Sequence, residues 1–122
     1  MILVDTSVWI DFLREDNLQL STLLEDCSVA MHPMVLGELS CGHLKNREHL
    51  LKLWMKLPTV IEASRDEAMY FLQQNKLYGK GIGLVDLLLL ASTALSDSTL
   101  LWTRDKRLNR MAKELNIAYS TS

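Results

Sequence analysis

Four acidic residues in this chain stand beside or inside apolar segments, where a charge does not help folding. They are Asp5, Glu38, Asp86 and Asp105. A carboxylate near a core costs several kcal/mol unless a cation or hydrogen-bond donors compensate it. If the four converge, their mutual repulsion favours a bound cation. A ligand set of oxygens without His or Cys selects hard ions, so the pattern predicts a site for Mg²⁺ or Mn²⁺.

Each acid also has a structural explanation that the sequence leaves open. Asp5 and Asp105 each precede a helical pattern and are therefore placed to cap a helix. Asp86 could be a hydrogen-bonded structural acid, although the helix predicted around it is apolar nearly all round and offers no solvated face. Glu38 could be a partly exposed helix residue, because Glu favours helices.

Short apolar runs without alternation are typical of strands that are covered on both faces. The predicted strands are Ile2–Val4, Ser28–Met31, Thr59–Glu62, Thr99–Thr103 and Ile117–Tyr119. The helical patterns between them are Ser7–Arg14, Leu18–Asp26, Pro33–His43, Arg47–Lys56, Ser64–Tyr78, Leu84–Ser96 and Asp105–Leu115. This alternation predicts one α/β domain over residues 1–122, a three-layer α/β/α sandwich with a central, mostly parallel sheet that has Ile2–Val4 near its middle. Ligands bind beyond the carboxyl ends of such strands, where Asp5 and Asp105 fall.

Composition and charge limit the classes of protein. With 48% apolar and 23% charged residues the chain is typical of a soluble globular domain. A net charge of -2 argues against binding nucleic acid by bulk electrostatics, although a local basic surface remains possible. No basic segment precedes Asp5, and the longest apolar stretch, Ile82–Leu95, contains Asp86 and falls short of the roughly 20 residues of a membrane span. We therefore expect a cytoplasmic protein with no membrane segment.

Cysteine and histidine do not indicate a zinc site. Cys27 and Cys41 belong to no CxxC pair, and we expect both to be free thiols. The three histidines have no neighbouring Cys or His at the spacing of zinc ligands; they are His32, His43 and His49.

A basic segment lies next to Asp105. It holds five of the 13 Lys and Arg residues, namely Arg104, Lys106, Arg107, Arg110 and Lys113. Such runs are usually solvated helix faces. The three nearest Asp105 (Arg104, Lys106 and Arg107) could instead bind the phosphate backbone of a nucleic acid. The three tryptophans are interpreted mainly as core or interface residues.

The segments that carry the acids resemble those of a known family. They are the opening MILVDTSVWI, Glu38-Leu39 with Gly42 shortly after, Gly83-Leu84-Val85-Asp86 at the start of an apolar helix, and LWTRDK over residues 101–106. Together they resemble the PIN-domain ribonucleases, and above all the VapC-type toxins of bacterial toxin–antitoxin pairs. The resemblance runs from Met1 to about Leu108. It departs from the family at Leu89-Leu90-Ala91, where Ile-Ala-Ala is more usual, and at Leu108, where an aromatic is usual; both differences concern packing.

The resemblance implies a metal-dependent endoribonuclease that hydrolyses RNA phosphodiester bonds. It implies that the four acids form one catalytic pocket, with Asp5 and Asp86 as the principal ligands of Mg²⁺ or Mn²⁺ and with Glu38 and Asp105 completing the site. It further implies a cognate antitoxin as partner and a homodimer as the state of the toxin. The hydroxyls near the metal would come from Thr6, Ser7 and Thr103.

Other readings of the acidic pattern fit less well. A response-regulator receiver needs an Asp after the third strand and a Lys after the fifth, where this chain has Glu62 and Ser120. A haloacid-dehalogenase-type phosphatase needs Asp-x-Asp after the first strand, where this chain has Asp5-Thr6-Ser7. The remaining alternative is a non-catalytic PIN-like module that binds RNA or a protein, and the retention of all four acids argues against it.

Overall fold

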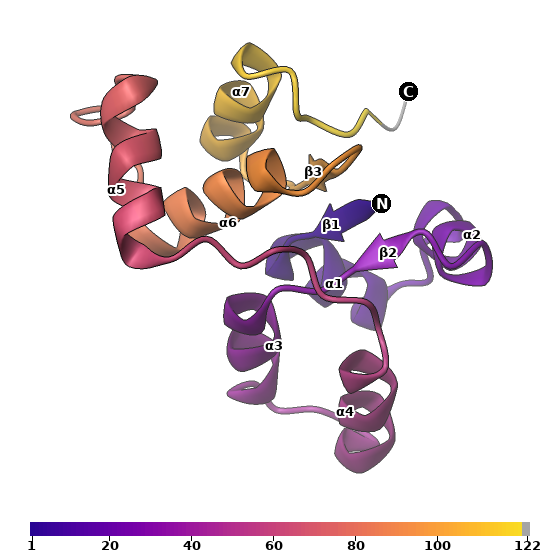
Figure 1. Cartoon of the computed structure of the whole chain (residues 1–122). Coiled ribbons are helices and arrows are strands. Elements are labelled where there is room, and N and C mark those ends of the chain that lie inside the picture. The colour runs from indigo at the N-terminus through magenta and orange to yellow at the C-terminus, as the bar shows by residue number, and fades with distance from the viewer. Residues whose placement is uncertain (121–122) are drawn as a thin grey trace.

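The computed structural model describes residues 1–120 and has a parallel sheet with β1 at its centre. In chain order the elements are β1 (Ile2–Val4), α1 (Thr6–Arg14), α2 (Leu18–Glu25), β2 (Val29–Ala30), α3 (Pro33–Ser40), α4 (Arg47–Met55), α5 (Arg65–Gln74), α6 (Leu84–Leu95), β3 (Leu100–Trp102) and α7 (Lys106–Glu114). β1 pairs in parallel with β2 on one side and β3 on the other (Figure 1). The predicted parallel sheet with Ile2–Val4 in the middle is therefore confirmed.

Two further segments extend the sheet by one bridge each. Thr59 pairs with Met31 and Ala118 pairs with Leu101, both in parallel. The predicted strands Thr59–Glu62 and Ile117–Tyr119 are thus reduced to single bridges. The first is short because its next amides bond elsewhere: the N–H of Ile61 donates to Ser96 Oγ, and that of Ala63 to Ser92 Oγ, both at 2.9 Å.

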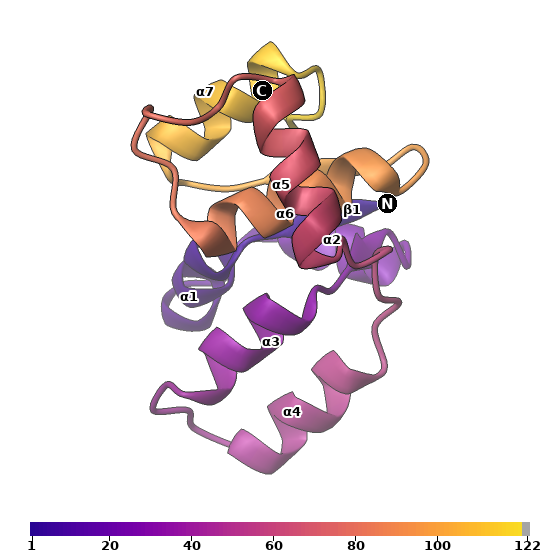
Figure 2. The ribbon, with the colours of Figure 1, turned by 60° about the vertical axis from the view of Figure 1, so that its left-hand side comes forward.

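Helices cover both faces of the sheet. Figure 2 shows α1, α3 and α4 on one side and α5, α6 and α7 on the other, which is the three-layer arrangement predicted from the alternation of strands and helices. The core includes Leu3, Val4, Leu89, Leu90 and Leu101, all with no exposed surface. Within residues 1–120, no helix has the length and apolar character needed to cross a bilayer.

Three helices end on a residue in the left-handed conformation that is not glycine. Cys27 after α2, Lys76 after α5 and Asn116 after α7 have φ values of 55, 52 and 61°. In each case the next amide donates back to the carbonyl five residues earlier, at 2.9 to 3.1 Å, which is the Schellman motif. Glycine usually marks this position. Because Lys76 stands there instead, the sequence carried no sign that the helix predicted over Ser64–Tyr78 ends at Gln74.

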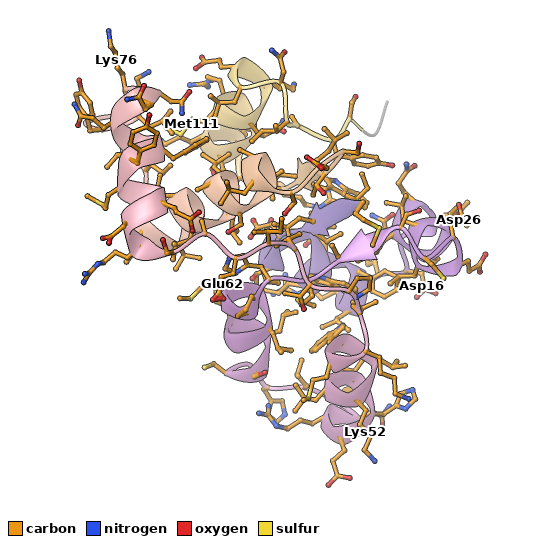
Figure 3. The ribbon with its side chains drawn as sticks, viewed as in Figure 1. Asp16, Asp26, Lys52, Glu62, Lys76 and Met111 are labelled. Atoms are coloured by element: carbon orange, nitrogen blue, oxygen red, sulfur yellow. The ribbon has the colours of Figure 1, made fainter. Side chains whose placement is uncertain are left out.

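Charged side chains lie mostly at the surface. Figure 3 shows Asp26, Lys52 and Lys76 pointing away from the ribbon. Among residues 1–120, Asp5 is the only Asp, Glu, Lys or Arg that is buried, with 8% of its surface exposed. The exception therefore lies at the carboxyl end of the central strand, where a ligand of a parallel sheet is expected.

Candidate active site

Asp5 is held at the end of β1 by hydrogen bonds with the first residues of α1 and with residues at and just after the end of β3. Its N–H donates to the carbonyl of Trp102 at the end of β3, at 2.9 Å. Its Oδ1 accepts the N–H of Thr6 at 2.8 Å, and its Oδ2 accepts the hydroxyls of Ser7 and Thr103 at 2.9 and 2.7 Å. Three donors thus compensate a buried charge that would otherwise oppose folding.

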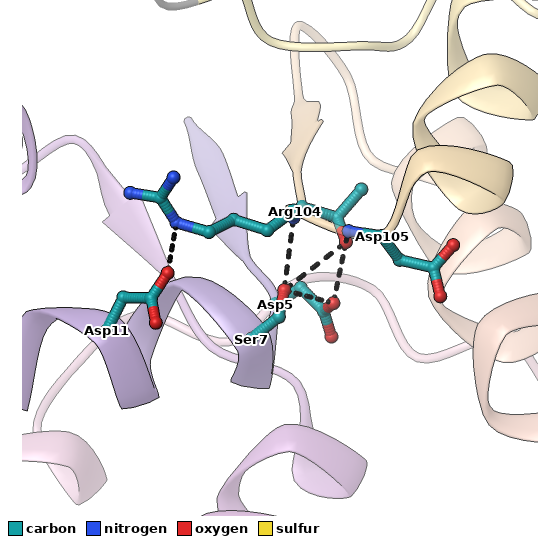
Figure 4. A network of polar contacts seen from close by, with 6 residues as sticks. Asp5, Ser7, Asp11, Arg104 and Asp105 are labelled. Atoms are coloured by element: carbon teal, nitrogen blue, oxygen red, sulfur yellow. Dashed lines mark hydrogen bonds and ion pairs between the residues drawn. The ribbon is translucent and has the colours of Figure 1, made fainter.

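The two hydroxyls are themselves oriented by the main chain after β3. Ser7 Oγ accepts the N–H of Arg104, and Thr103 Oγ1 accepts the N–H of Asp105, both at 3.1 Å (Figure 4). Because each oxygen accepts from an amide, its hydrogen is free to point at Asp5. This network joins the start of α1 to the segment between β3 and α7, as the predicted role of these hydroxyls requires.

Glu38 reaches the site from α3. Its side chain is exposed, which is compatible with the alternative explanation that Glu38 is a partly exposed helix residue. Its Oε1 accepts the hydroxyl of Thr6 at 2.7 Å. The Thr6 hydroxyl therefore positions Glu38, whereas the hydroxyls of Ser7 and Thr103 position Asp5.

Asp86 lies half-buried in the first turn of α6. Burial raises the pKa of its carboxyl group, and the negative charges of Asp5, Asp105 and Glu38 raise that pKa further. Over residues 1–120 its carboxylate receives no hydrogen bond and no ion pair. The charges of the other three predicted acids therefore reach Asp86, and within residues 1–120 no partner compensates its carboxylate.

Asp105 occupies the N-cap of α7. Its Oδ1 accepts the N–H of Leu108 at 2.9 Å, so the capping explanation holds in geometry. The side chain is also exposed and contributes to the field at Asp86. A cap and a site acid are compatible roles, because the cap uses one of the two carboxylate oxygens.

The donor set suits a hard divalent cation. It consists of four carboxylates and three hydroxyls, with no imidazole or thiolate, and Mg²⁺ and Mn²⁺ prefer such oxygens. As they stand, no three His, Cys, Asp or Glu side chains within residues 1–120 are placed to hold one ion. Glu38 and Asp105 are both exposed, whereas Asp5 is buried and Asp86 is half-buried.

Two of the three predicted RNA-contacting residues lie beside the acids, and the third pairs with Asp11. Arg104 Nε pairs with Asp11 Oδ2 at 2.5 Å, and its guanidinium lies on the opposite side from the Asp105 carboxylate (Figure 4). Lys106 and Arg107 line a cavity of about 590 Å³ beside the site. We call it the Asp86–Asp105 cavity, and its lining residues are Gly81, Asp86, Asp105, Lys106, Arg107 and Arg110.

Sequence reasoning missed the role of His32. It is 1% exposed; Nδ1 accepts the N–H of Met34 at 3.0 Å, and Nε2 lies 3.1 Å from Ser92 Oγ. Because Nδ1 accepts, the neutral ring carries its hydrogen on Nε2. Burial lowers the pKa of His32, and the charge of Glu62 partly opposes this. The available signal was its position directly before Pro33, which is where a helix cap stands. No sequence signal indicated that Asp11 would pair with Arg104.

Comparisons with known proteins identify the family of this chain. The PIN domain model matches residues 2–114, a range that contains all four acids. The chain therefore belongs to the PIN-domain family. Within that family, two relatives from two strains of Mycobacterium tuberculosis, both named Ribonuclease VapC32, are 42% identical to it over 118 residues, which are 97% of this chain and 95% of theirs. Its place is thus among the VapC-type members, as the opening motif and the order of the acids predicted.

Proposed function

We propose that this protein is a metal-dependent endoribonuclease that hydrolyses RNA phosphodiester bonds and acts as the toxin of a toxin–antitoxin pair. The relatives named Ribonuclease VapC32 support the activity. The observation that carries the proposal is Asp86, a carboxylate without a partner within residues 1–120, whose pKa is raised by burial and further by three other acids. Acids arranged at such a cost to stability are typical of functional sites.

Each residue of the site has a proposed role. Asp5 and Asp86 would be the principal ligands, and a bound Mg²⁺ or Mn²⁺ would neutralise phosphoryl charge and lower the pKa of a water. Glu38 and Asp105, at the exposed rim, complete the site or accept the proton that the attacking water loses. The water oxygen forms a bond to phosphorus while the bond to the leaving oxygen breaks. Ser7 and Thr103 hold Asp5 in the required orientation.

The RNA is proposed to approach along the start of α7. Arg104, Lys106 and Arg107 are exposed beside the acids. Their charges locally offset the net charge of -2 and attract a phosphate backbone. Of the three, Lys106 has no hydrogen bond or ion pair of its side chain within the described chain, so it is the most available to the substrate.

An antitoxin is proposed as the protein partner. A groove of about 760 Å³ runs between α1 and the α3–α4 connection and includes Glu38. Apolar residues line much of it, among them Ile10, Leu13, Leu44 and Leu50. A polypeptide in this groove would lie within reach of the acidic site and could present a basic side chain to it. Co-purification from the native operon tests this partner.

A homodimer is proposed as the state of the free toxin, in the cytoplasm where its RNA would be found. A second groove, of about 450 Å³, lies between α5 and α6. Its rim carries Tyr70 and Leu95, which are 68% and 40% exposed. Exposed apolar residues of this kind support association. Light scattering that finds only monomer at high concentration would remove this proposal.

The Asp86→Asn substitution tests the proposed function. The amide keeps the shape of the side chain and removes one like charge, so cleavage of RNA should be lost while the metal-free fold is as stable as before or more so. Mg²⁺ or Mn²⁺ at a hundred times its dissociation constant should stabilise the unsubstituted protein by about 2.7 kcal/mol, and the variant much less. Thermal melts with and without metal, beside a gel of total RNA, measure both effects.

The exposed Asp97 provides the matched control, because Asp97→Asn makes the same chemical change away from the site. This variant should cleave RNA and respond to metal as the unsubstituted protein does. If Asp86→Asn cuts RNA at the original rate, the site is wrong. If no metal supports cleavage by the unsubstituted protein, the non-catalytic module becomes the better description.

A further inference from the structure

One wall of the Asp86–Asp105 cavity is formed by the main chain at Gly81. This glycine belongs to the loop from Gly79 to Gly83, which leads directly into α6, the helix that carries Asp86. Arg107 of α7 reaches across to it, and its Nη1 donates to the carbonyl oxygen of Gly81 at 3.1 Å. One hydrogen bond therefore joins the segments that carry Asp86 and Asp105.

Gly81 and Arg107 fit together without room for a side chain. A Cβ on Gly81 would stand 2.4 Å from Arg107 Nη1 and 3.0 Å from Cζ, so the guanidinium packs closely on this glycine. Gly81 also has a φ of +81°, which favours glycine. Gly79 has a similar φ of +74°, yet a Cβ there would meet nothing within 4 Å. A comparison of substitutions at Gly79 and Gly81 therefore separates the effect of backbone strain from the effect of contact with Arg107.

We infer that Arg107 is a positioning residue, which holds the Gly79–Gly83 loop as a fixed wall of the cavity and thereby places the start of α6 and the carboxylate of Asp86. The inference rests on the proposed ribonuclease function and changes the role first predicted for Arg107, which was direct contact with RNA. Arg110 and Lys106 line the same cavity, and over residues 1–120 their side chains make no hydrogen bond or ion pair. These two are the cations left to bind an RNA phosphate.

Hydrogen exchange tests the effect on the loop without any need for activity. In Arg107→Ala, the amides of residues 79–83 and the amide of Leu87, which donates to the carbonyl of Gly83, should exchange faster, because the loop opens more often once the hydrogen bond from Arg107 to the Gly81 carbonyl is lost. Arg110→Ala removes the same charge from the same helix and should leave that exchange unchanged. Gly81→Ala should reproduce Arg107→Ala by displacing the guanidinium, beyond any effect seen in Gly79→Ala. Unchanged loop exchange in Arg107→Ala would overturn the inference.

RNA kinetics test whether the loop matters for cleavage. Arg107→Ala should lower kcat roughly tenfold to a hundredfold through misplacement of the acids. Its binding of a short, fluorescein-labelled single-stranded RNA in EDTA should keep the salt dependence of the unsubstituted protein. Arg110→Ala should instead weaken binding and reduce the slope of log affinity against log salt by about 0.7, the value for one lost phosphate contact. If Arg107→Ala loses the same slope and keeps its kcat, Arg107 contacts RNA itself and the inference is wrong.

The double variant Gly81→Ala/Arg107→Ala adds an independent check. Both substitutions break the same contact, so together they should slow cleavage no more than the slower of the two alone. Fully additive losses would show that the two residues act separately and would also overturn the inference. Failure of the proposed function has a different signature, because the unsubstituted protein would then cleave no RNA while the exchange of the loop still responds to Arg107→Ala.

Discussion

Asp105 combines a helix cap in the fold with a proposed role in the chemistry. Its Oδ1 caps α7 through the N–H of Leu108, and its charge adds to the field that raises the pKa of Asp86. The cap needs only an oxygen that accepts a hydrogen bond, and an amide supplies one as well as a carboxylate does. The proposed role in the chemistry needs the charge. The two roles can therefore be separated by the choice of substitution.

Asp105→Asn should leave the free energy of unfolding within about 0.5 kcal/mol of the unsubstituted value while RNA cleavage is lost, because Asn caps helices as well as Asp. Asp105→Ala should lose cleavage and about 1 kcal/mol of stability. Urea unfolding without metal and a gel of total RNA measure the two effects. Ser64→Ala, which removes the cap of α5, should lose similar stability and keep cleavage. An Asn variant with full activity would leave Asp105 with its capping role alone.

The four acids could be selected from the sequence because each stands beside or inside an apolar run, where a charge is unusual. Their partners were less so. Thr103 was expected near the site through a resemblance, yet its bond to Asp5 spans 98 positions and depends on β1 and β3 being neighbours. The Asp11–Arg104 pair joins the middle of α1 to the segment between β3 and α7, and pairs between partly exposed side chains leave no pattern in the sequence.

At the scale of elements, His32 joins three parts of the chain. It caps α3 through Met34, and it meets Ser92 of α6, which in turn accepts the N–H of Ala63. These side-chain bonds also draw residues 61–63 away from β2. The predicted strand Thr59–Glu62 failed for this reason, since its apolar residues gave no sign that serines of a distant helix would take its amides.

The neutral His32 ring predicts a loss of stability in mild acid. Its folded-state pKa is below the ordinary value of 6.5, so the unfolded chain takes up a proton first as pH falls. The contribution is complete above pH 6.5 and is lost as the pH falls from there through the lower folded-state pKa, by at most about 1.4 kcal/mol per pH unit. Urea midpoints between neutral and mildly acidic pH measure this loss.

Two variants give the pH prediction its controls. His32→Asn keeps an acceptor for the cap and should lose the histidine's share of the pH dependence, whereas His43→Asn, at an exposed position, should keep it. Glu62→Gln removes the charge that raises the pKa of His32, so it should make the dependence steeper. Parallel losses of stability in the unsubstituted protein and in His32→Asn would contradict the account.

At the scale of the whole molecule, two tryptophans attach α4 to the core. The rings of Trp9 and Trp54 meet edge to face with centroids 5.7 Å apart, and both are nearly fully buried. Within the described chain the Nε1 of Trp9 has no hydrogen-bond partner, so packing alone makes this junction. The sequence indicated that both tryptophans were core or interface residues, although periodicity could not pair them, because they lie on helices far apart in the chain.

Trp54→Ala should lower the free energy of unfolding by about 3–5 kcal/mol, the usual loss for a buried tryptophan. This is a large fraction of the roughly 5–15 kcal/mol that holds a domain of this kind together. Met55, the next residue, is 73% exposed, and Met55→Ala should change stability by no more than about 0.5 kcal/mol. Urea unfolding followed by circular dichroism compares them. Equal stability of the two variants would mean that α4 is attached elsewhere.

The hydrogen bond between Thr103 and Asp5, which are 98 positions apart, also determines when the site can be completed during translation. A ribosome adding about 5–20 residues per second needs about 5 to 20 s to pass from one residue to the other. From the synthesis of Glu38 until shortly before Thr103, the growing polypeptide contains Asp5 and Glu38 but neither β3 nor the hydroxyl that orients Asp5. If the proposed site is the catalytic one, a chain still attached to the ribosome at this stage should not cleave the RNA around it, because translation delivers the last part of the pocket near the end of the chain.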